Sequence, residues 1–340
     1  MSVQIERTEP FGNHSFIAAS GAGTYYVVGN QLVHVLAEAS QTNQLFELVL
    51  VTGGKGAYFP LHRHDHLYET IFVLEGKLEV ILDGKKYMVT AYDYIHIPPK
   101  TIHGYRMHSH KTRFISFAVG GTITDIYSQI GKVVSLDEWS KMDNAFELDL
   151  FQQAEVQSDI LLVHGLRELS STTRPSPVFE SQLPVNVQSY VLEAGEGKRF
   201  LVDGQLHELI ATEETTDSNF CMCVTEGGRG SAFFSHYHKI HTEAFYCLEG
   251  QMILHLNGEE ICLMPGDFVY IPPNTVHSYR LEAHSNKFLA FLLPGGIGKV
   301  FEQFGESGGP HICPYITKAD QRIPTVETYA DYDMYIVCQD

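Results

Sequence analysis

The sequence predicts an all-β protein made of two tandem antiparallel β-barrels of the jelly-roll type, with a few short flanking helices. Three observations predict this fold class. Residues 15–131 align with residues 189–305 without insertion or deletion, and roughly a third of the better-matched positions are identical. Each copy contains many short apolar runs broken by turns, which is typical of a sandwich or barrel. Helical periodicity is sparse, so the few helices should lie outside the barrels.

The strands are predicted from short apolar runs that end at turn residues. Residues 46–51 lead into a glycine-rich turn, and residues 78–82 end at Asp83-Gly84. An Asp-Gly or Asn-Gly pair after such a run is a strong β-hairpin signal. The second copy repeats this pattern, because Met252–Leu256 is followed by Asn257-Gly258. These runs predict antiparallel neighbours in both copies.

Helices are expected at Ile123–Ile130 and Ile297–Phe304, each after its barrel, and a further helical segment at 159–170. The two copies predict a division into an N-terminal domain, residues 1–150, and a linker with the C-terminal domain, residues 151–340. The Pro- and Ser-containing stretch 171–177 is the expected connector, since its composition resists regular structure.

The composition predicts an intracellular, cytoplasmic protein. The net charge of −18 argues against nucleic acid or an anionic membrane as a partner. No apolar run approaches the roughly 18 residues that a membrane span needs, and the N-terminus lacks a signal-peptide pattern. The six cysteines all lie in the second copy and form no Cys-x-x-Cys pair, which favours reduced thiols. A homodimer is left open.

Each copy also carries three histidines and one glutamate at the same spacing. Every member of the second set lies 174 residues after its counterpart in the first. The two candidate metal-ligand sets are His62, His64, Glu69 and His103 in the first copy, and His236, His238, Glu243 and His277 in the second. A lone His-x-His is often only a polar surface strand, but two matched sets at a constant offset strongly favour a duplicated metal site.

Strand geometry explains how four such residues can meet. Side chains at positions i and i+2 of a strand point to the same face, so His62 and His64 should both face the barrel interior. Glu69 and His103 would arrive on two later strands. Three imidazoles and a carboxylate suit a divalent first-row ion, with Fe(II) the first choice and Mn(II), Co(II) or Ni(II) as alternatives, two ions per chain. A structural zinc site would more often use cysteines, and none lies near either set.

These residues resemble the two sequence motifs of cupins. The first copy reads Gly56-x5-His62-x-His64-x4-Glu69-x6-Gly76, followed by Asp93, Pro98 and His103. The second copy fits better, because Gly266-Asp267 precedes Pro272 and His277, whereas the first copy has Tyr92 where the motif expects glycine. The turn position of Tyr92 should keep it away from the ligands. The whole chain resembles the bacterial-type bicupin quercetin 2,3-dioxygenases, most closely around His236–Met252 and Asn274–Arg280.

This resemblance implies a reaction, cofactors and residue roles. Quercetin 2,3-dioxygenases open the central ring of a flavonol with O2 and release carbon monoxide. The resemblance places the metal on the substrate's 3-hydroxyl and gives the ligand glutamates, Glu69 and Glu243, a catalytic role as acceptors of that proton. Such a role is chemically reasonable for a carboxylate beside a metal ion. The simpler alternative is that each glutamate is only a ligand.

The substrate pocket should be apolar, to suit a flat aromatic molecule. The residues expected to line it are Ile71, Val73 and Tyr105 in the first copy, and Phe245, Cys247 and Tyr279 in the second. The aliphatic pair Ile71 and Val73 should leave more room than Phe245 does. We therefore expect the N-terminal site to dominate turnover.

Two other kinds of function stay open. One is a bicupin oxygenase or isomerase that acts on another aromatic metabolite, since cupins change substrate through their pocket residues. The other is a non-catalytic metal-binding cupin, although neither copy has lost a ligand. Oxalate decarboxylases share the ligand set, but they carry an arginine at the positions of Phe59 and Phe233. Chemistry on a small diacid is therefore disfavoured.

Overall fold

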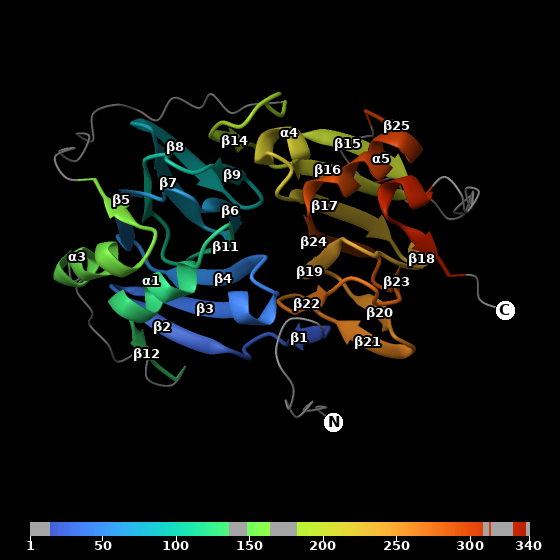
Figure 1. The fold of residues 1–340 in the computed structure, drawn as a ribbon, viewed down its shortest axis with the longest axis horizontal. Coiled ribbons are helices and arrows are strands. Elements are labelled where there is room, and N and C mark those ends of the chain that lie inside the picture. The colour runs from blue at the N-terminus through green and yellow to red at the C-terminus, as the bar shows by residue number, and fades with distance from the viewer. Residues whose placement is uncertain (1–13, 136–147, 164–181, 309–312, 314–328, 338–340) are drawn as a thin grey trace.

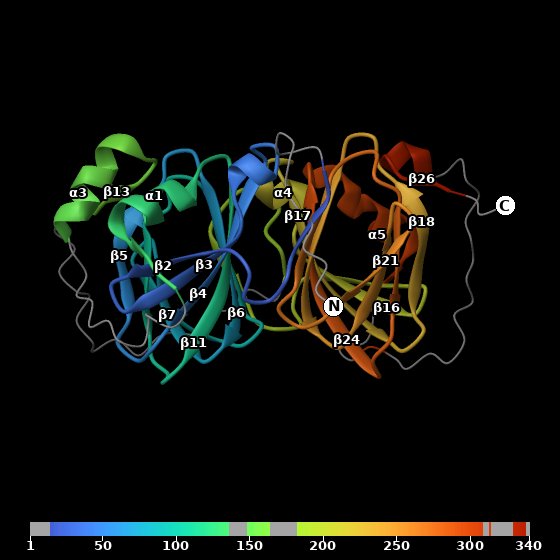
Figure 2. The same ribbon diagram turned by 90° about the horizontal axis from the view of Figure 1, so that it is seen from below.

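Two β-barrels lie side by side and are joined through broad sheets (Figure 1, Figure 2). The structure, a computed structural model, describes residues 14–135, 148–163, 182–308, 313 and 329–337. The predicted all-β fold with two tandem barrels and few short helices is confirmed. The expected connector at 171–177 lies outside the described residues.

The N-terminal barrel pairs an eight-stranded sheet with a five-stranded sheet. The strand orders are β12-β2-β3-β4-β11-β6-β9-β14 and β13-β5-β10-β7-β8. The strands are β2 (Thr24–Val28), β3 (Gln31–Ala37), β4 (Phe46–Gly53), β5 (Tyr58–Arg63), β6 (Tyr68–Glu75), β7 (Lys77–Leu82), β8 (Lys85–Thr90), β9 (Tyr94–Ile97), β10 (His103–Met107), β11 (Thr112–Val119), β12 (Lys132–Val133), β13 (Leu161–Leu162) and β14 (Tyr190–Leu192).

The C-terminal barrel repeats this arrangement. Its strand orders are β1-β22-β19-β24-β17-β16-β15-β25 and β21-β20-β23-β18-β26. The strands are β1 (Phe16–Ala18), β15 (Lys198–Val202), β16 (Gln205–Ala211), β17 (Cys221–Gly228), β18 (Ala232–Tyr237), β19 (Thr242–Glu249), β20 (Met252–Leu256), β21 (Glu259–Leu263), β22 (Phe268–Ile271), β23 (His277–Leu281), β24 (Ser285–Leu293), β25 (Glu306–Ser307) and β26 (Tyr335–Ile336).

The predicted hairpins form at the expected turn residues. Asp83-Gly84 joins β7 to β8, and Asn257-Gly258 joins β20 to β21. All four turn residues have positive φ angles, between 46° and 88°. Two consecutive residues of positive φ form the turn whose twist matches that of antiparallel strands, and Asn, Asp and Gly adopt this conformation at the lowest cost.

The helices are short and lie outside the two barrels. They are η1 (Ala39–Gln41), α1 (Ile123–Ile130), α3 (Leu148–Gln157), α4 (Glu213–Thr216), η2 (Gly295–Gly298), α5 (Lys299–Phe304) and η3 (Ala330–Tyr332). The prediction for α1 is confirmed, because Ile123, Ile126, Tyr127 and Ile130 follow helical spacing and are all buried. The second predicted helix is divided between η2 and α5.

The helical segment predicted at 159–170 is wrong where the structure describes it. Leu161 and Leu162 instead form β13, which pairs with Arg63 and His62 of β5. Two residues are too few to show a helical or strand period, so the apolar run was ambiguous. Residues 164–170 lie outside the described residues.

The two barrels exchange their first strands. β1 precedes the N-terminal barrel in sequence but pairs with β22 of the C-terminal barrel, with Phe16 opposite Tyr270. β14 lies 174 residues later and pairs with β9 of the N-terminal barrel, with Tyr190 opposite His96. The division of the chain at residue 150 stays a prediction. Each eight-stranded sheet contains strands from before and after that residue.

A shared apolar layer joins the barrels. Phe117 and its repeat counterpart Phe291 contact each other directly, with ring centroids 4.7 Å apart, and both are fully buried. Separate apolar clusters fill the inside of each barrel. Each eight-stranded sheet is therefore apolar on both faces, one turned to its own barrel and one to the partner barrel.

Tyr92 lies at this junction, in the turn predicted for it. Its φ angle of 72° falls in the left-handed region, which is costly for a bulky residue, and the repeat has Gly266 there with a φ of 96°. The Tyr92 hydroxyl donates a hydrogen bond to Glu249 of the other barrel, and the Lys287 ammonium lies 4.5 Å from the centre of its ring. Contacts between the barrels thus hold the strained turn.

Candidate metal centres

The structure brings each predicted set of four side chains together inside its barrel. His62 is the next-to-last residue of β5, Glu69 lies on β6, and His103 begins β10 directly opposite His62. All four residues of the set are buried, and their ligand atoms lie within 4.8 Å of one another. The set in the second copy has the same arrangement and the same burial.

Backbone carbonyls fix the orientation of all six histidines. Because a carbonyl can only accept a hydrogen bond, the Nδ1 atom of each ring must be the donor, which leaves the Nε2 lone pair facing the other ligands. The acceptor carbonyls are those of Pro60 for His62, Asp159 for His64, Thr101 for His103, Phe234 for His236, Asp333 for His238 and Thr275 for His277.

The atoms that face the centre of each set are histidine Nε2 atoms and carboxylate oxygens, and they have too few hydrogen-bond donors among them. The Nε2 atoms of His64 and His236 are buried and have no hydrogen-bond partner. The Nε2 atom of His103 lies 3.0 Å from a Glu69 oxygen, and the Nε2 atom of His277 lies 3.1 Å from a Glu243 oxygen. Lone pairs and a carboxylate at such distances repel one another unless a proton or a metal ion lies between them. The residues present therefore fit a bound divalent metal ion.

Both glutamates are held in the anionic form that a metal ligand requires. Burial alone raises the pKa of each carboxyl group, but hydrogen bonds and positive charge from protonated neighbouring imidazoles, whose place a bound metal ion would take, outweigh burial. The pKa of Glu69 and that of Glu243 therefore lie well below their usual range.

Two aspartates that the sequence analysis missed support the ligand loops. The Asp159 carboxylate accepts hydrogen bonds from the backbone N–H groups of Asp65, His66 and Leu67, at 2.8 to 3.0 Å. Asp333 does the same for residues 239–241. Asp333 lies 174 residues after Asp159, so the repeat extends further than the region first aligned. That constant offset is the signal that could have identified both.

Ser116 is a second residue that sequence reasoning missed, and it is present in one copy only. Its hydroxyl donates a hydrogen bond of 2.7 Å to Glu69 Oε1. The repeat has Ala290 at this position, and Glu243 Oε1 instead lies 3.1 Å from His238 Nε2. The two glutamates are therefore oriented differently although their ligand sets are identical.

A cavity opens beside each ligand set. The space beside the ligand set, counted together with its opening to solvent, is about 300 Å³ in the N-terminal barrel and about 460 Å³ in the C-terminal barrel. Of the predicted pocket residues, Ile71, Tyr105, Phe245 and Tyr279 line these cavities. Val73 and Cys247 do not, because they lie two residues further along the same strands and pack into the barrel cores.

The two tyrosines on the cavity walls are held in place by buried glutamines. The Tyr105 hydroxyl donates to Gln31 Oε1 at 2.6 Å, and the Tyr279 hydroxyl donates to Gln205 Oε1 at 2.9 Å. Because both hydroxyls are engaged in this way, the rings present mainly their apolar faces to the cavities.

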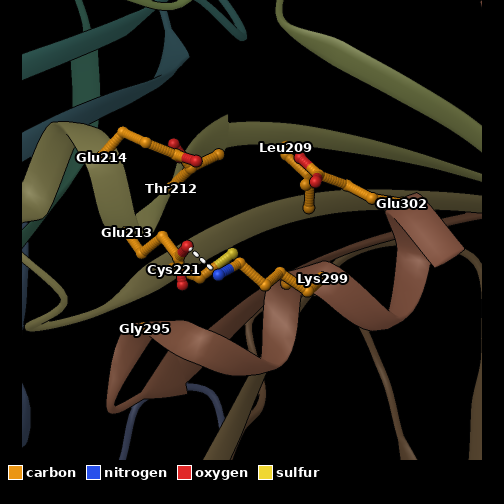
Figure 3. Close-up of a pocket in the computed structure, with 9 residues that line it drawn as sticks. Leu209, Thr212, Glu213, Glu214, Cys221, Gly295, Lys299 and Glu302 are labelled. Atoms are coloured by element: carbon orange, nitrogen blue, oxygen red, sulfur yellow. Dashed lines mark ion pairs between the residues drawn. The ribbon is translucent and has the colours of Figure 1, made fainter. Parts of the chain in front are cut away.

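The helices that border the two cavities are anchored in different ways. In the first copy, the buried Glu47 carboxylate accepts hydrogen bonds from the backbone and hydroxyl of Thr124 at the start of α1. In the second copy, Cys221 replaces Glu47, and Lys299 of α5 forms an ion pair with Glu213 of α4 instead. Figure 3 shows this ion pair in a small surface pocket. The described residues that line this pocket include no histidine.

A third cluster of metal-binding residue types, formed by His238, His241 and Asp333, shares His238 with the second ligand set. His241 Nδ1 lies 2.8 Å from an Asp333 oxygen, and His66 in the first copy is largely exposed. Both histidines therefore lie at the ligand loops without adding a separate site.

Known proteins agree with this architecture. A family model for the cupin domain matches residues 49–118 and 220–291. The chain is 41% identical over 300 residues to quercetin 2,3-dioxygenase of Bacillus subtilis, with 88% of each chain covered. The chain belongs to the bicupin quercetin 2,3-dioxygenase family. A quercetin 2,3-dioxygenase of Aspergillus japonicus is 24% identical over 176 residues, which cover 47% of this chain and 50% of the fungal protein.

Solved structures with the same fold are more distant in sequence. Oxalate decarboxylase from Bacillus subtilis superposes with a TM-score of 0.54 and 14% identity, covering 85% of this chain and 78% of that one. Salicylate 1,2-dioxygenase from Pseudoaminobacter salicylatoxidans gives a TM-score of 0.52, also at 14% identity, covering 78% of this chain and 73% of that one. These likenesses establish the fold alone.

Proposed function

We propose that this chain is a metal-dependent dioxygenase that cleaves the central ring of a flavonol, or a related polyphenol, with O2. The observation that carries the proposal is the pairing, in both copies, of a buried set of three histidines and a glutamate with an apolar, aromatic-walled cavity. Membership of the quercetin 2,3-dioxygenase family supports the same reaction.

The ligand residues would hold one divalent first-row ion in each barrel. Fe(II) is our first choice, and Mn(II), Co(II) and Ni(II) are compatible with the same donors. When bound, such an ion supplies Lewis-acid activation and brings the substrate and O2 together. His62, His64, Glu69 and His103 would provide the first site, and His236, His238, Glu243 and His277 the second.

The chain's own residues would prepare the substrate. Glu69 and Glu243 are anionic and lie at the cavity edge, so each can accept the proton of a substrate hydroxyl group. The backbone carbonyls that hold the histidine Nδ1 atoms keep the ligands from rotating. The apolar walls, including Tyr105 and Tyr279, exclude water around a flat ring system.

Alternative functions are less well supported by the cavity walls. The described residues lining the two cavities include no lysine or arginine, and Phe59 and Phe233 lie beside the first histidine of each set. These walls offer no cationic partner for a small diacid such as oxalate. An oxygenase or isomerase acting on another aromatic metabolite remains the second candidate. A metal-binding cupin without activity is the third.

One experiment tests the proposal directly. Metal analysis of protein purified without chelator should approach two equivalents of a first-row metal per chain. When the same protein is supplied with quercetin in air, the flavonol absorbance should fall and carbon monoxide should be released. Zinc alone, with no activity after exchange to iron, manganese, cobalt or nickel, would refute the oxygenase function.

The cellular location and assembly are further proposals. The structure has no described helix that is long and apolar enough to cross a membrane. The five described cysteines form no disulfide, which supports the proposed cytoplasmic location. Cell fractionation and measurement of the mass in solution would test the location and the open question of a homodimer.

A further inference from the structure

A histidine outside both ligand sets lines the C-terminal cavity. His207 lies on β16, is 2% exposed, and borders the same cavity as His236 and Glu243. Its repeat counterpart is Val33, and its neighbour Thr225 on β17 corresponds to Val51. Both valines are buried in the apolar core of the first barrel. The barrel fold therefore does not require a polar pair at these positions.

One nitrogen of His207 has no partner. Its Nδ1 atom lies 2.9 Å from the Thr225 hydroxyl oxygen, and its ring stacks on Phe301 with centroids 4.5 Å apart. Its Nε2 atom is buried without a hydrogen bond. Burial lowers the pKa of His207 to about 3, so the ring is neutral near pH 7. Two side-chain contacts thus fix the ring while the second nitrogen is left unpaired.

An unpaired buried polar atom destabilises a protein unless something else binds it. Nearly all buried polar groups in native structures have a partner, so an exception at a cavity wall indicates a place where a ligand or an ordered water belongs. The His207 ring is also far from Glu243, the glutamate of the metal-ligand set. Glu243 is on β19, and β24 and β17 separate β19 from β16. Three strand spacings correspond to roughly 14 Å along the curved sheet.

We propose that His207 binds a phenolic hydroxyl group of the substrate, at the end of the molecule remote from the metal, in the C-terminal cavity only. The choice of a phenol follows from the chemistry of the ring. The Thr225 hydroxyl can donate to Nδ1 or accept from it, so Nε2 is either a donor or an acceptor. A phenolic hydroxyl can satisfy both states, whereas a carbonyl or ether oxygen satisfies only one.

The proposal rests on the proposed flavonol chemistry and adds a recognition group to one of the two sites. A flavonol that carries hydroxyl groups on its outer rings would contact the metal ligands at one end and His207 at the other. The N-terminal cavity, with Val33 and Val51, lacks this second contact. The C-terminal site should therefore discriminate between flavonols by their outer hydroxyl groups.

The test measures binding without oxygen, so that no turnover occurs. The metal-loaded full chain carrying His62→Ala/His64→Ala isolates the C-terminal site, and it is titrated with quercetin and with 3-hydroxyflavone, which lacks the outer hydroxyl groups. His207→Val, which copies the N-terminal residue, should weaken quercetin binding by about three- to tenfold, within the range one hydrogen bond supplies. Binding of 3-hydroxyflavone should stay within about twofold. His207→Gln, which keeps a donor and an acceptor, should retain most of the preference for quercetin.

Two controls separate binding from packing. In a His236→Ala/His238→Ala background, where only the N-terminal site is intact, His207→Val should leave both affinities unchanged. The melting temperature of His207→Val is measured as well, because the substitution removes an unpaired buried nitrogen together with the contacts to Thr225 and Phe301. Equal losses of affinity for both compounds would show that His207 only packs. Unchanged affinities would show that it binds only water. If neither compound binds the parent protein, the proposed substrate class fails and this inference fails with it.

Discussion

The two metal centres share their ligands and the carbonyls that orient them, but their cavity walls differ. Asp159 and Asp333 hold the ligand loops in the same way, and the six histidine Nδ1 atoms meet equivalent carbonyls. Around this common framework, some corresponding positions differ. Ser116 of the first copy corresponds to Ala290 of the second, and Val33 corresponds to His207. The two halves have thus retained the metal-ligand set and have changed residues of the cavity wall and the residue beside the glutamate.

The cavity volumes contradict the expectation that the N-terminal site is the roomier one. The C-terminal cavity is larger although Phe245 lines it, at about 460 Å³ against about 300 Å³. The first cavity is narrowed by residues outside the glutamate strand. Phe151 of α3 packs edge-on to Phe59, with centroids 5.2 Å apart, and Tyr127 of α1 also lines this cavity. A cavity's size thus depends on the covering helices as much as on its strands.

The largest effect should come from removing one metal site at a time. His62→Ala/His64→Ala and His236→Ala/His238→Ala should each bind one metal equivalent instead of two. We still expect the N-terminal pair to remove most of the turnover, now because Ser116 orients Glu69 and not because of cavity volume. Metal content and kcat measured on both proteins decide this. If the C-terminal pair abolishes activity while the N-terminal metal stays bound, the ranking is reversed.

The next largest effect should come from the glutamates. Glu69→Gln keeps an oxygen that can coordinate metal, but it cannot accept a proton at neutral pH. We expect metal to be retained and turnover at that site to fall by roughly 10²- to 10⁴-fold. Glu243→Gln is the matched change in the other half. Each is measured with the opposite site inactivated, and full rates with full metal content in both would show that neither glutamate is the base.

A smaller effect is expected from the aspartates behind the ligand loops. Asp159→Ala removes the acceptor of three backbone N–H groups and loosens the segment whose carbonyl orients His64. Loss of such supporting groups typically weakens metal binding by about 10- to 100-fold. The N-terminal site should lose affinity while the C-terminal site is unchanged, and Asp333→Ala should give the opposite result. Competition with a chelator measures both affinities, and equal losses at both sites would indicate general destabilisation instead.

These aspartates also mark the limit of what the sequence could reveal. The ligand sets were predictable because duplicated His, Glu and Gly spacings are rare, and the hairpins were predictable because Asp-Gly and Asn-Gly have specific backbone preferences. Asp159 lies 92 to 94 residues from the loop residues that it binds. Ser116 lies among apolar residues in the second half of β11, where a lone serine has no local pattern. Side chains that act through tertiary contacts leave little periodic signal.

The smallest expected effect concerns Ser116, and it tests the comparison most directly. The Ser116 hydroxyl donates to Glu69 Oε1, so it restricts rotation of the carboxylate and leaves Oε2 toward the histidines. Ser116→Ala copies the C-terminal half and should lower kcat of the isolated N-terminal site by a few-fold, up to about tenfold, because one hydrogen bond to a charged group is lost. Losing that donor also stabilises the anionic carboxylate less and so raises its basicity. The effects of orientation and of basicity on kcat therefore partly oppose each other.

The reciprocal change separates orientation from basicity. Ala290→Ser places a hydroxyl at the matching position beside Glu243, on a site that already binds metal through the same four ligands. If orientation is the main contribution, kcat of the isolated C-terminal site should rise while Ser116→Ala lowers that of the N-terminal site, with metal affinity unchanged in both. If both substitutions shift the pH dependence of kcat and leave its maximum unchanged, the serine acts through the pKa of the glutamate. If Ser116→Ala changes neither quantity, the different orientations of the two glutamates do not account for any difference in rate between the halves.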